Sequence, residues 1–320
     1  MADKAGWQIN EGKLKDNANS NLLAVVSSSI LAGKHTTTYK YGLLKSILDN
    51  VYNVNDDKEI SFDKLAETFT SIYWNMINVY NIPQMTSYMT GARSSFEKLI
   101  EKTVEEKPYL KGRFYDSISE KEQKLISKRT YNEFSKYVVG AFYDDTDGLI
   151  YGFSKKQKKI WFNNKSLSFL REHKMVLEQV NYYNWLKNVE TILKSNKQSI
   201  DNLSTILECI TKRQSLDQYK KELINLGEKE VCFYCGKELK GIKHLDHVIP
   251  WDFIRNDDLW NFVFACKTCN SSKNNKVPNK DYIKKLKERN KALKLSCPDI
   301  DSLVKDASLN GFSIDWKPHK

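Results

Sequence analysis

The sequence lacks several features that would assign it to a specialised class of protein. Its first apolar run, Leu22 to Val26, is short and is followed by three serines, and the first twenty residues mix acidic and basic side chains. A signal peptide or a transmembrane helix needs a longer apolar run, so we expect a cytoplasmic chain with no membrane partner. An internal repeat, a low-complexity tract and a helix-turn-helix signature are also absent. With 40% hydrophobic residues, however, wholesale disorder is excluded.

Cysteine is scarce, with six residues in 320, yet four of the six form two Cys-x-x-Cys pairs. The first pair is Cys232 and Cys235, and the second is Cys266 and Cys269. This is the spacing at which four thiolates close a tetrahedral zinc site. A redox role is disfavoured because neither pair lies in an evident βαβ context. Cys209 and Cys297 remain as expected free thiols, which fits a reducing cytoplasm.

Between and just after the two pairs lie side chains suited to phosphodiester chemistry. In chain order they are Asp246, His247, Asn261, Asn270 and Lys273. Together with the cysteines, this order resembles the HNH, or ββα-metal, nuclease family in its zinc-bracketed form, over roughly residues 229–280. The resemblance implies that His247 is the general base and that Asp246 and Asn270 bind a divalent cation. It also implies that Asn261 is structural and braces the loop that orients His247.

The same roles follow from the chemistry of phosphodiester hydrolysis. The reaction needs a deprotonated water, a cation on the scissile phosphate and a stabilised leaving oxygen. An imidazole has its ordinary pKa nearest neutral pH, so His247 suits the first task. The oxygen ligands of Asp246 and Asn270 suit a hard cation, Mg²⁺ or Mn²⁺. Lys273 would share a helix face with Asn270 and is expected to reach the same phosphate.

The Asp-His pair raises a geometric difficulty. Side chains alternate along a regular strand, so adjacent Asp246 and His247 would point to opposite faces. The strand must therefore twist, bulge or end there, and Pro250 favours an end soon after His247. Alternation puts His244 on the face of Asp246, where it is either a third metal ligand, a phosphate contact or a structural residue.

The charge distribution indicates a polyanionic partner. The chain has 51 Lys and Arg against 40 Asp and Glu, a formal net charge of +11. From Lys229 to Lys294 there are fifteen Lys or Arg and eight Asp or Glu, so most of the excess lies in and just after the motif. Any single lysine is as well explained by a solvated surface, but the bias of the whole segment favours nucleic acid, which we expect to be double-stranded DNA.

The region before the motif is predicted to be mainly helical. The apolar spacing predicts helices over residues 39–48, 62–77, 182–193 and 216–226, with Ser61 as a cap for the second. Residues 137–143 and 149–162 are predicted to be strands that residues 144–148 join as a turn. The aromatic residues, Tyr73 and Trp74 among them, are expected to be core. Lys155 to Lys159 is either a DNA contact or a solvated hairpin tip.

A basic helix is predicted after the motif, from a cap at Asn279 to about Leu295. The residues expected to be buried are Tyr282, Ile283, Leu286 and Leu293. Those expected to be exposed are Lys284, Lys285, Lys287, Arg289, Lys291 and Lys294. Pro298 ends the helix, and the final segment, with Ile314 and Trp316, is expected to pack back onto a domain.

These observations predict an α+β chain of two domains and a tail. Residues 1–226 form a mainly helical domain with a β-hairpin, for target recognition or regulation. Residues 227–296 form a zinc-braced ββα-metal nuclease domain with the basic helix, and residues 297–320 form the tail.

The function predicted from the sequence is that of a metal-dependent DNA endonuclease with a structural zinc. The layout resembles that of bacterial restriction or other anti-phage enzymes. Two alternatives stay open: a catalytically silent zinc protein that binds nucleic acid, and a nuclease acting on RNA or single strands. Because such a domain cuts one strand per active site, double-strand cleavage would need either a homodimer or two sequential events.

Overall fold

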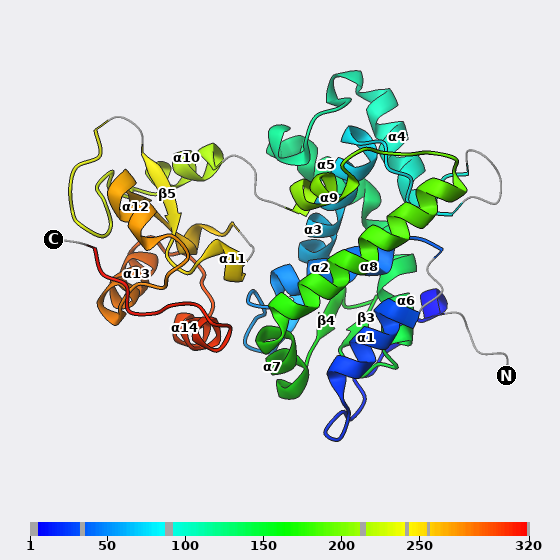
Figure 1. The fold of residues 1–320 in the computed structure, drawn as a ribbon, viewed down its shortest axis with the longest axis horizontal. Helices are drawn as coiled ribbons and strands as arrows, with labels where there is room; N and C mark the ends of the chain where they lie inside the picture. Colours follow the sequence, from blue (N-terminus) through cyan, green and yellow to red (C-terminus); the bar gives the residue numbers. More distant parts are fainter. Residues whose placement is uncertain are drawn as a thin grey trace. The chain divides into compact units, whose positions relative to one another are not determined.

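The computed structural model describes residues 6–32, 36–86, 92–211, 216–240, 243–254 and 257–318. The chain divides into two compact units, Met1–Lys212 and Arg213–Lys320, which we call the N-terminal and C-terminal units (Figure 1). Helices dominate the N-terminal unit, and each unit contains a small antiparallel sheet. The predicted α+β class is confirmed.

The N-terminal unit is built from helices and short strands. The α-helices are α1 Leu22–Ala32, α2 Tyr39–Asn50, α3 Phe62–Trp74, α4 Ser95–Glu106, α5 Glu120–Glu133, α6 Val139–Asp145, α7 Asn164–Glu172, α8 Lys174–Ser195 and α9 Leu203–Thr211. The 3₁₀-helices are η1 Gly6–Gln8, η3 Pro108–Leu110 and η4 Tyr115–Ser117, and the π-helices are η2 Asn75–Val79 and η5 Phe134–Val138. The strands are β1 Glu11–Gly12, β2 Glu59–Ser61, β3 Gly152–Ser154 and β4 Lys159–Trp161.

Helix α3 shows how the sequence determines the core of this unit. The Ser61 side chain accepts a hydrogen bond from the backbone N–H of Lys64 and caps the helix, as predicted. The apolar face is fully buried, and the ring centroids of Phe69 and Tyr73 lie 4.4 Å apart. Tyr73 and Trp74 have no exposed surface, which confirms that these aromatic residues form core packing.

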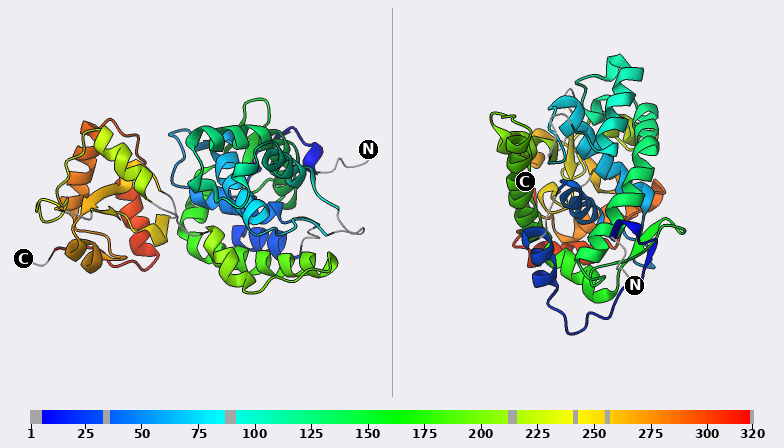
Figure 2. Two further views of the ribbon diagram at one scale, coloured as in Figure 1. Left: turned by 90° about the horizontal axis from the view of Figure 1, so that it is seen from above. Right: turned by 90° about the vertical axis from the view of Figure 1, so that its right-hand side faces the viewer.

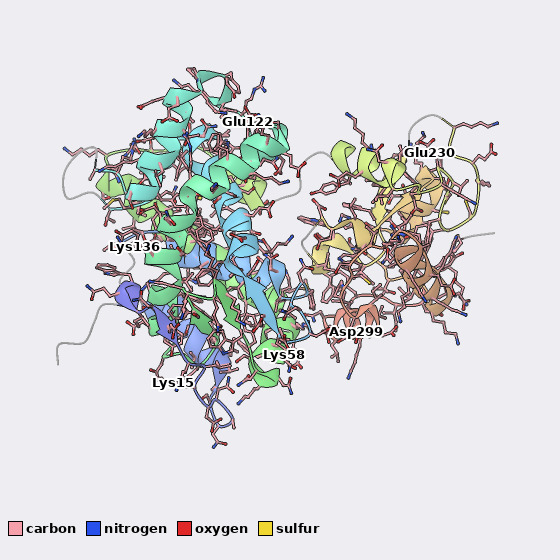
Figure 3. All side chains as sticks on the ribbon, turned by 180° about the vertical axis from the view of Figure 1, so that it is seen from behind. Lys15, Lys58, Glu122, Lys136, Glu230 and Asp299 are labelled. Atoms are coloured by element: carbon pink, nitrogen blue, oxygen red, sulfur yellow. The ribbon has the colours of Figure 1, made fainter. Side chains whose placement is uncertain are left out.

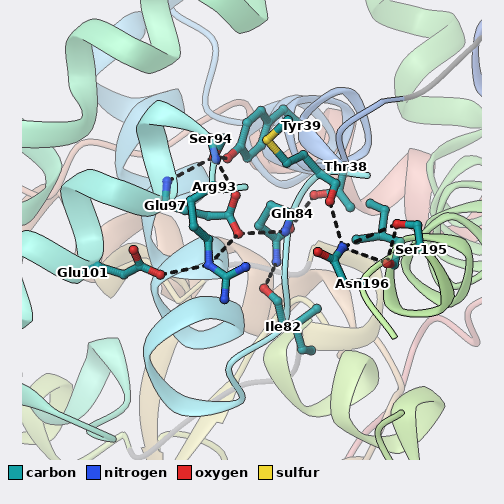
Figure 4. A network of polar contacts seen from close by, with 12 residues as sticks. Thr38, Tyr39, Ile82, Gln84, Arg93, Ser94, Glu97, Glu101, Ser195 and Asn196 are labelled. Atoms are coloured by element: carbon teal, nitrogen blue, oxygen red, sulfur yellow. Dashed lines mark hydrogen bonds and ion pairs between the residues drawn. The ribbon is translucent and has the colours of Figure 1, made fainter. Parts of the chain in front are cut away.

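A buried polar network joins α4 to the loops before it (Figure 4). Ser94 and Glu97 form a capping box, in which Glu97 accepts from the backbone N–H of Ser94 at 2.8 Å. Glu97 also accepts from the backbone N–H of Gln84 at 3.0 Å. Burial raises the pKa of Glu97, and these hydrogen bonds oppose that rise. The network satisfies polar groups that the surrounding core would otherwise leave unpaired.

The prediction of a strand over residues 137–143 is wrong. This segment is helical, in η5 and α6, and the predicted turn that follows is the end of α6. Phe134, Val138 and Phe142 recur at helical spacing and are all buried, whereas the run of apolar residues between them suggested a strand. Residues 149–162 hold two strands, β3 and β4, joined by a turn at residues 155–158.

These strands belong to a four-stranded antiparallel sheet with the order β1-β3-β4-β2. Ile60 of β2 pairs with Ile160 of β4, which in turn pairs with Phe153 of β3. All three side chains are buried. The sheet therefore contains a β-hairpin, but it joins β3 to β4 through residues 155–158, whereas the prediction placed it between residues 137–143 and 149–162.

The long helix α8 covers one face of the N-terminal unit (Figure 2) and packs on α2. Lys174 at its start is completely buried and pairs with Glu178. Lys45 and Asp49 of α2 form a second ion pair beside it, with Lys45 Nζ 3.8 Å from a Glu178 carboxylate oxygen. Burial lowers the pKa of Lys174 and raises that of Asp49, while the neighbouring opposite charges oppose both shifts.

The C-terminal unit contains two strands and five α-helices within its described residues. The helices are α10 Asp217–Asn225, α11 Trp251–Ile254, α12 Lys267–Lys273, α13 Lys280–Ala292 and α14 Ile300–Leu309, with a 3₁₀-helix η6 Leu259–Asn261. The strands are β5 His244–His247 and β6 Phe262–Ala265. Leu223 of α10 packs in one cluster with Leu245, Phe262 and Phe264 of the two strands. The unit therefore begins before α10, earlier than the expected boundary at residue 226.

The basic helix is present as α13. Asn279 caps it, accepting from the backbone N–H of Tyr282 at 3.4 Å, as predicted. Ile283 and Leu286 are buried, whereas Tyr282 and Leu293 are only half-buried.

Arg289 of α13 does not lie on the exposed face, contrary to the prediction. Its guanidinium donates to the backbone carbonyls of Trp260 at 3.1 Å and Phe262 at 2.6 Å, and lies 3.6 Å from Glu228. Carbonyl groups at the start of β6 need donors, and a planar guanidinium supplies several. Sequence spacing alone could not distinguish this residue from its solvated neighbours.

The last segment packs within the C-terminal unit. Trp316 is buried, and its ring centroid lies 5.1 Å from that of Tyr234. Its backbone forms an isolated parallel β-bridge with that of Pro278. Ile314 is half exposed instead. Among the described helices of the chain, none combines the length and apolar character needed to cross a bilayer.

Candidate metal and nuclease site

The four paired cysteines converge on one point. The sulfur atoms of Cys232, Cys235, Cys266 and Cys269 lie within 4.8 Å of one another. The first pair lies on a tight turn in which Gly236 has a φ of +73°, a conformation that favours glycine. Four thiolates at this spacing fit a structural zinc ion, so the donor set agrees with the predicted zinc site.

Backbone N–H groups surround the sulfur atoms. Burial opposes ionisation of the Cys232 thiol, but hydrogen bonds from the N–H groups of Cys235, Cys266 and Tyr234 lower its pKa to about 7. The sulfur of Cys266 accepts from the N–H of Cys269 at 3.5 Å and serves as the N-cap of α12. One cysteine thus links the cluster to the first turn of this helix.

Strands β5 and β6 and helix α12 form a ββα unit directly beside the cluster. β5 pairs with β6 in antiparallel register, with Asp246 opposite Val263 and His247 opposite Phe262. β5 ends at His247, as the position of Pro250 predicts. Bends at Val248 and Ile249 follow the strand, while Asp246 and His247 both keep regular pairing within it.

A pocket of about 280 Å³ opens at the end of β5. Its lining combines residues of β5, α11 and α12: Leu245, Asp246, His247, Pro250, Trp251, Asn270, Ser271, Asn274 and Asn275. Three of the predicted site residues, Asp246, His247 and Asn270, therefore face one space. Asn274 has a φ of +45°, which residues other than glycine rarely adopt.

Asp246 is held by two buried donors. The Tyr234 hydroxyl donates to Oδ2 at 2.5 Å, and Lys273 Nζ lies 3.1 Å from the same oxygen. Burial raises the pKa of Tyr234 well above its ordinary value, and the neighbouring Asp246 adds to the rise, so the hydroxyl remains a donor. These contacts fix the orientation of the carboxylate at the pocket.

His247 is almost completely buried and is held on two sides. Its Nε2 lies 2.9 Å from Oδ1 of Asp257, and its ring centroid lies 4.3 Å from that of Phe262. A carboxylate on Nε2 favours the tautomer that carries a proton there. The contact also stabilises the imidazolium that forms when the ring accepts a proton.

Asn261 is buried and braces the segment after His247. Its Oδ1 accepts from the N–H of Ile249, and its Nδ2 donates to the carbonyl of the same residue, both at 2.8 Å. The backbone carbonyl of Asn261 accepts from the N–H of Val248 at 2.9 Å. An amide side chain is needed to meet a donor and an acceptor at once, and this agrees with the structural role expected for Asn261.

Lys273 has different contacts from those expected. Its side chain is completely buried, and its Nζ donates to the backbone carbonyl of His247 at 2.6 Å as well as to Asp246. Burial lowers its pKa, and the charge of Asp246 opposes this change. In this arrangement the ammonium holds the Asp-His segment against α12 and does not project toward a phosphate in the pocket.

His244 lies at the start of β5, opposite Ala265 of β6. It is half-buried and is not one of the residues that line the pocket. The structure therefore gives no support to a role for this residue as a third ligand of the catalytic cation.

Sequence analysis missed two residues of the site. Tyr234 lies between the first two cysteines, and its residue type alone does not mark it as part of the site. Asp257 lies in an acidic pair with Asp258, in a loop whose approach to His247 depends on the fold. The only available signal for both was their closeness in sequence to the motif.

Comparison with known families agrees with this geometry. Residues 232–276 match the HNH endonuclease family, which confirms the predicted resemblance, and the cysteine cluster is consistent with its zinc-bracketed form. Residues 19–141 match a domain of unknown function, DUF8808. No curated protein and no solved structure was found to match the chain. The HNH match supports nuclease activity in general and a nucleic-acid substrate.

Proposed function

We propose that the chain is a metal-dependent endonuclease that hydrolyses DNA phosphodiester bonds in restriction or anti-phage defence, in the bacterial cytoplasm. The observation that supports this most directly is the pocket shared by Asp246, His247 and Asn270 beside the cysteine cluster. An imidazole, a carboxylate and an amide are the groups that metal-assisted phosphodiester hydrolysis requires.

Each residue has a separate task in this proposal. His247 accepts the proton of the attacking water, and Asp257 stabilises the charge that the ring gains. Asp246 and Asn270 would hold Mg²⁺ or Mn²⁺, and when bound this ion offsets the charge that develops on the phosphate. Lys273 and Tyr234 orient Asp246, and Asn261 orients the backbone after His247.

The cysteine cluster supports a structural and not a catalytic zinc. Four protein ligands complete a tetrahedral site and leave no open position for water or substrate. Cys266 connects that site to α12, which carries Asn270. Elemental analysis of the purified chain is expected to find about one zinc per molecule.

Plasmid cleavage tests the proposal. Purified chain is incubated with supercoiled plasmid and with phage DNA, with Mg²⁺ added or omitted, and the products are separated into nicked and linear forms. We expect Mg²⁺-dependent nicking that His247→Ala abolishes. If the chain binds plasmid and retains zinc but does not nick the plasmid with either Mg²⁺ or Mn²⁺, the result supports the alternative of a catalytically silent zinc protein that binds nucleic acid.

Two further substrates separate the remaining alternatives. Single-stranded DNA and RNA of the same sequence are offered beside the duplex, and preferential cleavage of either would replace the duplex substrate in the proposal. Linear product that appears without nicked product indicates a homodimer, whereas linear product that follows it indicates sequential cuts. Plating of phage on cells that express the chain or its His247→Ala variant tests the defence role.

A further inference from the structure

An exposed aromatic pair lies on the surface of the N-terminal unit. Trp7 of η1 is 40% exposed and Tyr137 of η5 is 36% exposed. Their ring centroids lie 5.5 Å apart, with the ring planes inclined by 46°. Single exposed apolar side chains are ordinary, but two adjacent rings leave a continuous aromatic surface in water.

Lysines surround this pair. The ammonium of Lys136 lies 4.7 Å from the centroid of the Tyr137 ring, and Figure 3 shows its position at the surface. Lys155, at the start of the β3–β4 turn, donates to the backbone carbonyls of both Trp7 and Lys136 at 3.0 Å. We call Trp7, Lys136, Tyr137 and Lys155 the Trp7 patch.

Acidic side chains offset part of the positive charge around the patch, and the Asp144 carboxylate lies beside Gly6. Burial lowers the pKa of Lys155, and the neighbouring charge of Lys136 lowers it further. The turn that Lys155 begins also carries Lys156 and Lys158, both of which are exposed. Glu133, one turn before Lys136, supplies a negative charge near the patch. Its carboxylate accepts a hydrogen bond from the Ser95 hydroxyl. The surplus of lysines favours an anionic partner.

The backbone around the patch is built for close packing. A Cβ atom at Gly140 would lie 2.5 Å from the carbonyl oxygen of Gly6, and one at Gly6 would lie 2.6 Å from Cβ of Asp144. Only glycine at both positions allows η1 to pack this closely on α6. This packing sets Trp7 beside Tyr137, which lies on a π-helical turn, an element often found at functional sites.

We propose that the Trp7 patch binds an unpaired nucleotide of a nucleic-acid strand, with the base stacked on the Trp7 ring. The proposal rests on the proposed nuclease function and adds a substrate-binding site in the other unit. Every base has a face that stacks on an aromatic ring, and ammonium groups beside the ring contact the flanking phosphates. An acidic protein segment would also contact the lysines, but it would not make binding depend on whether a nucleic acid is single-stranded or double-stranded.

The test measures binding of short fluorescent oligonucleotides to the full chain, in a His247→Ala background that prevents cleavage. Trp7→Ala is expected to weaken binding of a single strand about fivefold to a hundredfold, the range typical of one stacked base. Binding of a blunt duplex of the same sequence should change less than about twofold, because its bases are already stacked. Trp7→Phe, which keeps an aromatic ring, should bind the single strand with an affinity between those of Trp7→Ala and the parent.

Matched variants control for surface changes in general. Tyr109 is 55% exposed, but its hydroxyl donates to the carboxylate of Glu122, so Tyr109→Ala should leave binding unchanged. Lys136→Gln should reduce the dependence of single-strand affinity on salt, whereas Lys124→Gln, which removes a lysine paired with Glu120, should not. The proposal is overturned if Trp7→Ala binds a single strand as tightly as Tyr109→Ala, or if only the lysine variant has an effect.

Photocrosslinking gives a second measurement that does not depend on the folding of Trp7 variants. An oligonucleotide containing 5-iodouracil is irradiated with the His247→Ala chain, and crosslinked peptides are identified by mass spectrometry. Crosslinks at Trp7 or Tyr137 support the site, and crosslinks confined to other segments contradict it.

Plasmid cleavage by the unmodified chain, assayed in parallel, distinguishes the proposed binding site from the proposed nuclease function. If the chain cleaves plasmid but Trp7→Ala does not weaken binding, only the proposed role of the Trp7 patch is rejected. If Trp7→Ala weakens binding but the chain does not cleave plasmid, only the proposed nuclease function is rejected.

Discussion

Two carboxylates near His247 have different surroundings, and the difference separates their roles. Asp246 is buried and accepts from a tyrosine hydroxyl and a buried ammonium, so its position is fixed by contacts within the protein. Asp257 is about one-fifth exposed and contacts the imidazole itself. The first is placed to hold an ion, and the second is placed to control the orientation and charge of the base.

Replacement of the proposed general base is the most direct test at the residue scale. His247→Ala is expected to lower the cleavage rate by about 10² to 10⁴, the usual contribution of general-base catalysis. Zinc content and the thermal unfolding curve should stay close to those of the parent. His244→Ala, three residues earlier on the same strand, is the matched control and should cleave normally, since His244 does not line the pocket. Full activity in His247→Ala would contradict the mechanism.

Asp257 is expected to act through His247. A hydrogen bond to a charged group contributes about 1.5 to 3 kcal/mol, so Asp257→Ala should lower kcat about tenfold to a hundredfold with little change in KM. Asp257→Asn keeps an oxygen acceptor and should recover part of the loss. Asp258→Asn serves as the control at the neighbouring position. An equal effect on kcat and KM in all three variants would indicate a disturbed loop and not a positioned base.

The site was predictable where chemistry and spacing act together. Two Cys-x-x-Cys pairs and an Asp-His pair have few other uses in this order, and the structure groups them as expected. Lys273 illustrates the limit of such reasoning. Lys273 does lie one helical turn after Asn270 in α12, but whether a lysine reaches outward or is buried under a strand depends on packing that one sequence does not show.

At the scale of elements, the contact between α2 and α8 depends on a buried ion cluster. Lys174→Met would leave the carboxylates of Asp49 and Glu178 with one cation fewer, and breaking a buried cluster in this way typically costs about 3 to 5 kcal/mol of unfolding free energy. Lys187→Met, on the exposed side of the same helix, should change stability by less than about 0.5 kcal/mol. Urea unfolding monitored by circular dichroism measures both.

The loss of unfolding free energy in Lys174→Met should depend on pH because the pKa of Asp49 is raised. Because burial raises the folded-state pKa above the unfolded value of 3.8, folding favours the protonated acid. This contribution is complete below pH 3.8 and is lost as the pH rises through the folded-state pKa. The penalty of Lys174→Met should therefore shrink as the pH falls from 7 toward 4. A penalty that grows on acidification would show that the carboxylate is not the group left uncompensated.

Helix α10 should be required by the C-terminal unit. Leu223 is fully buried against Leu245, Phe262 and Phe264, so Leu223→Ala is expected to destabilise this unit by about 2 to 5 kcal/mol. Ile224→Ala, at a neighbouring position that is 42% exposed, is the control. A fragment that begins at residue 228 should likewise unfold at lower urea than one that begins at residue 213. Equal stability of the two fragments would place α10 outside the unit.

Element prediction succeeded for long amphipathic helices and failed where apolar residues were continuous. α2, α3 and α13 have one apolar face each, and the period alone locates them, whereas α8 begins at Lys174, eight residues before the predicted range of 182–193. Around Val138 and Val139 the apolar run fits a strand as well as a buried helix. There the choice is made by tertiary packing, which buries Phe134 and Phe142 on the same side. Strands β1 and β2, of two and three residues, are too short to leave any periodic signal in the sequence.

At the scale of the whole molecule, the division into two units suggests a division of labour. Most of the net positive charge of the chain lies between Lys229 and Lys294, so residues 213–320 alone are expected to bind DNA weakly and with strong salt dependence. With roughly five phosphate contacts, the logarithm of affinity should fall with the logarithm of salt at a slope of about −4.5. Selectivity should then come from the N-terminal unit. Comparison of cleavage maps and salt slopes for the fragment and the full chain measures both.

The control for this comparison is the same fragment carrying His247→Ala, which should bind with an unchanged slope and cut nothing. If the active fragment cuts at the same positions as the full chain, the N-terminal unit does not choose the site. A role in dimerisation, partner binding or activation would then explain that unit better.

The double use of Cys266 has a thermodynamic consequence. Its sulfur is both a member of the cysteine cluster and the cap of α12, and α12 carries Asn270 into the pocket. If a zinc ion orders the start of this helix, it also raises the affinity of the pocket for its own cation. Such coupling is reciprocal, so occupation of the pocket must tighten the hold on zinc by the same factor. A zinc-selective chelator should consequently remove less zinc at equilibrium when Mg²⁺ is present, even though the two ions share no ligand.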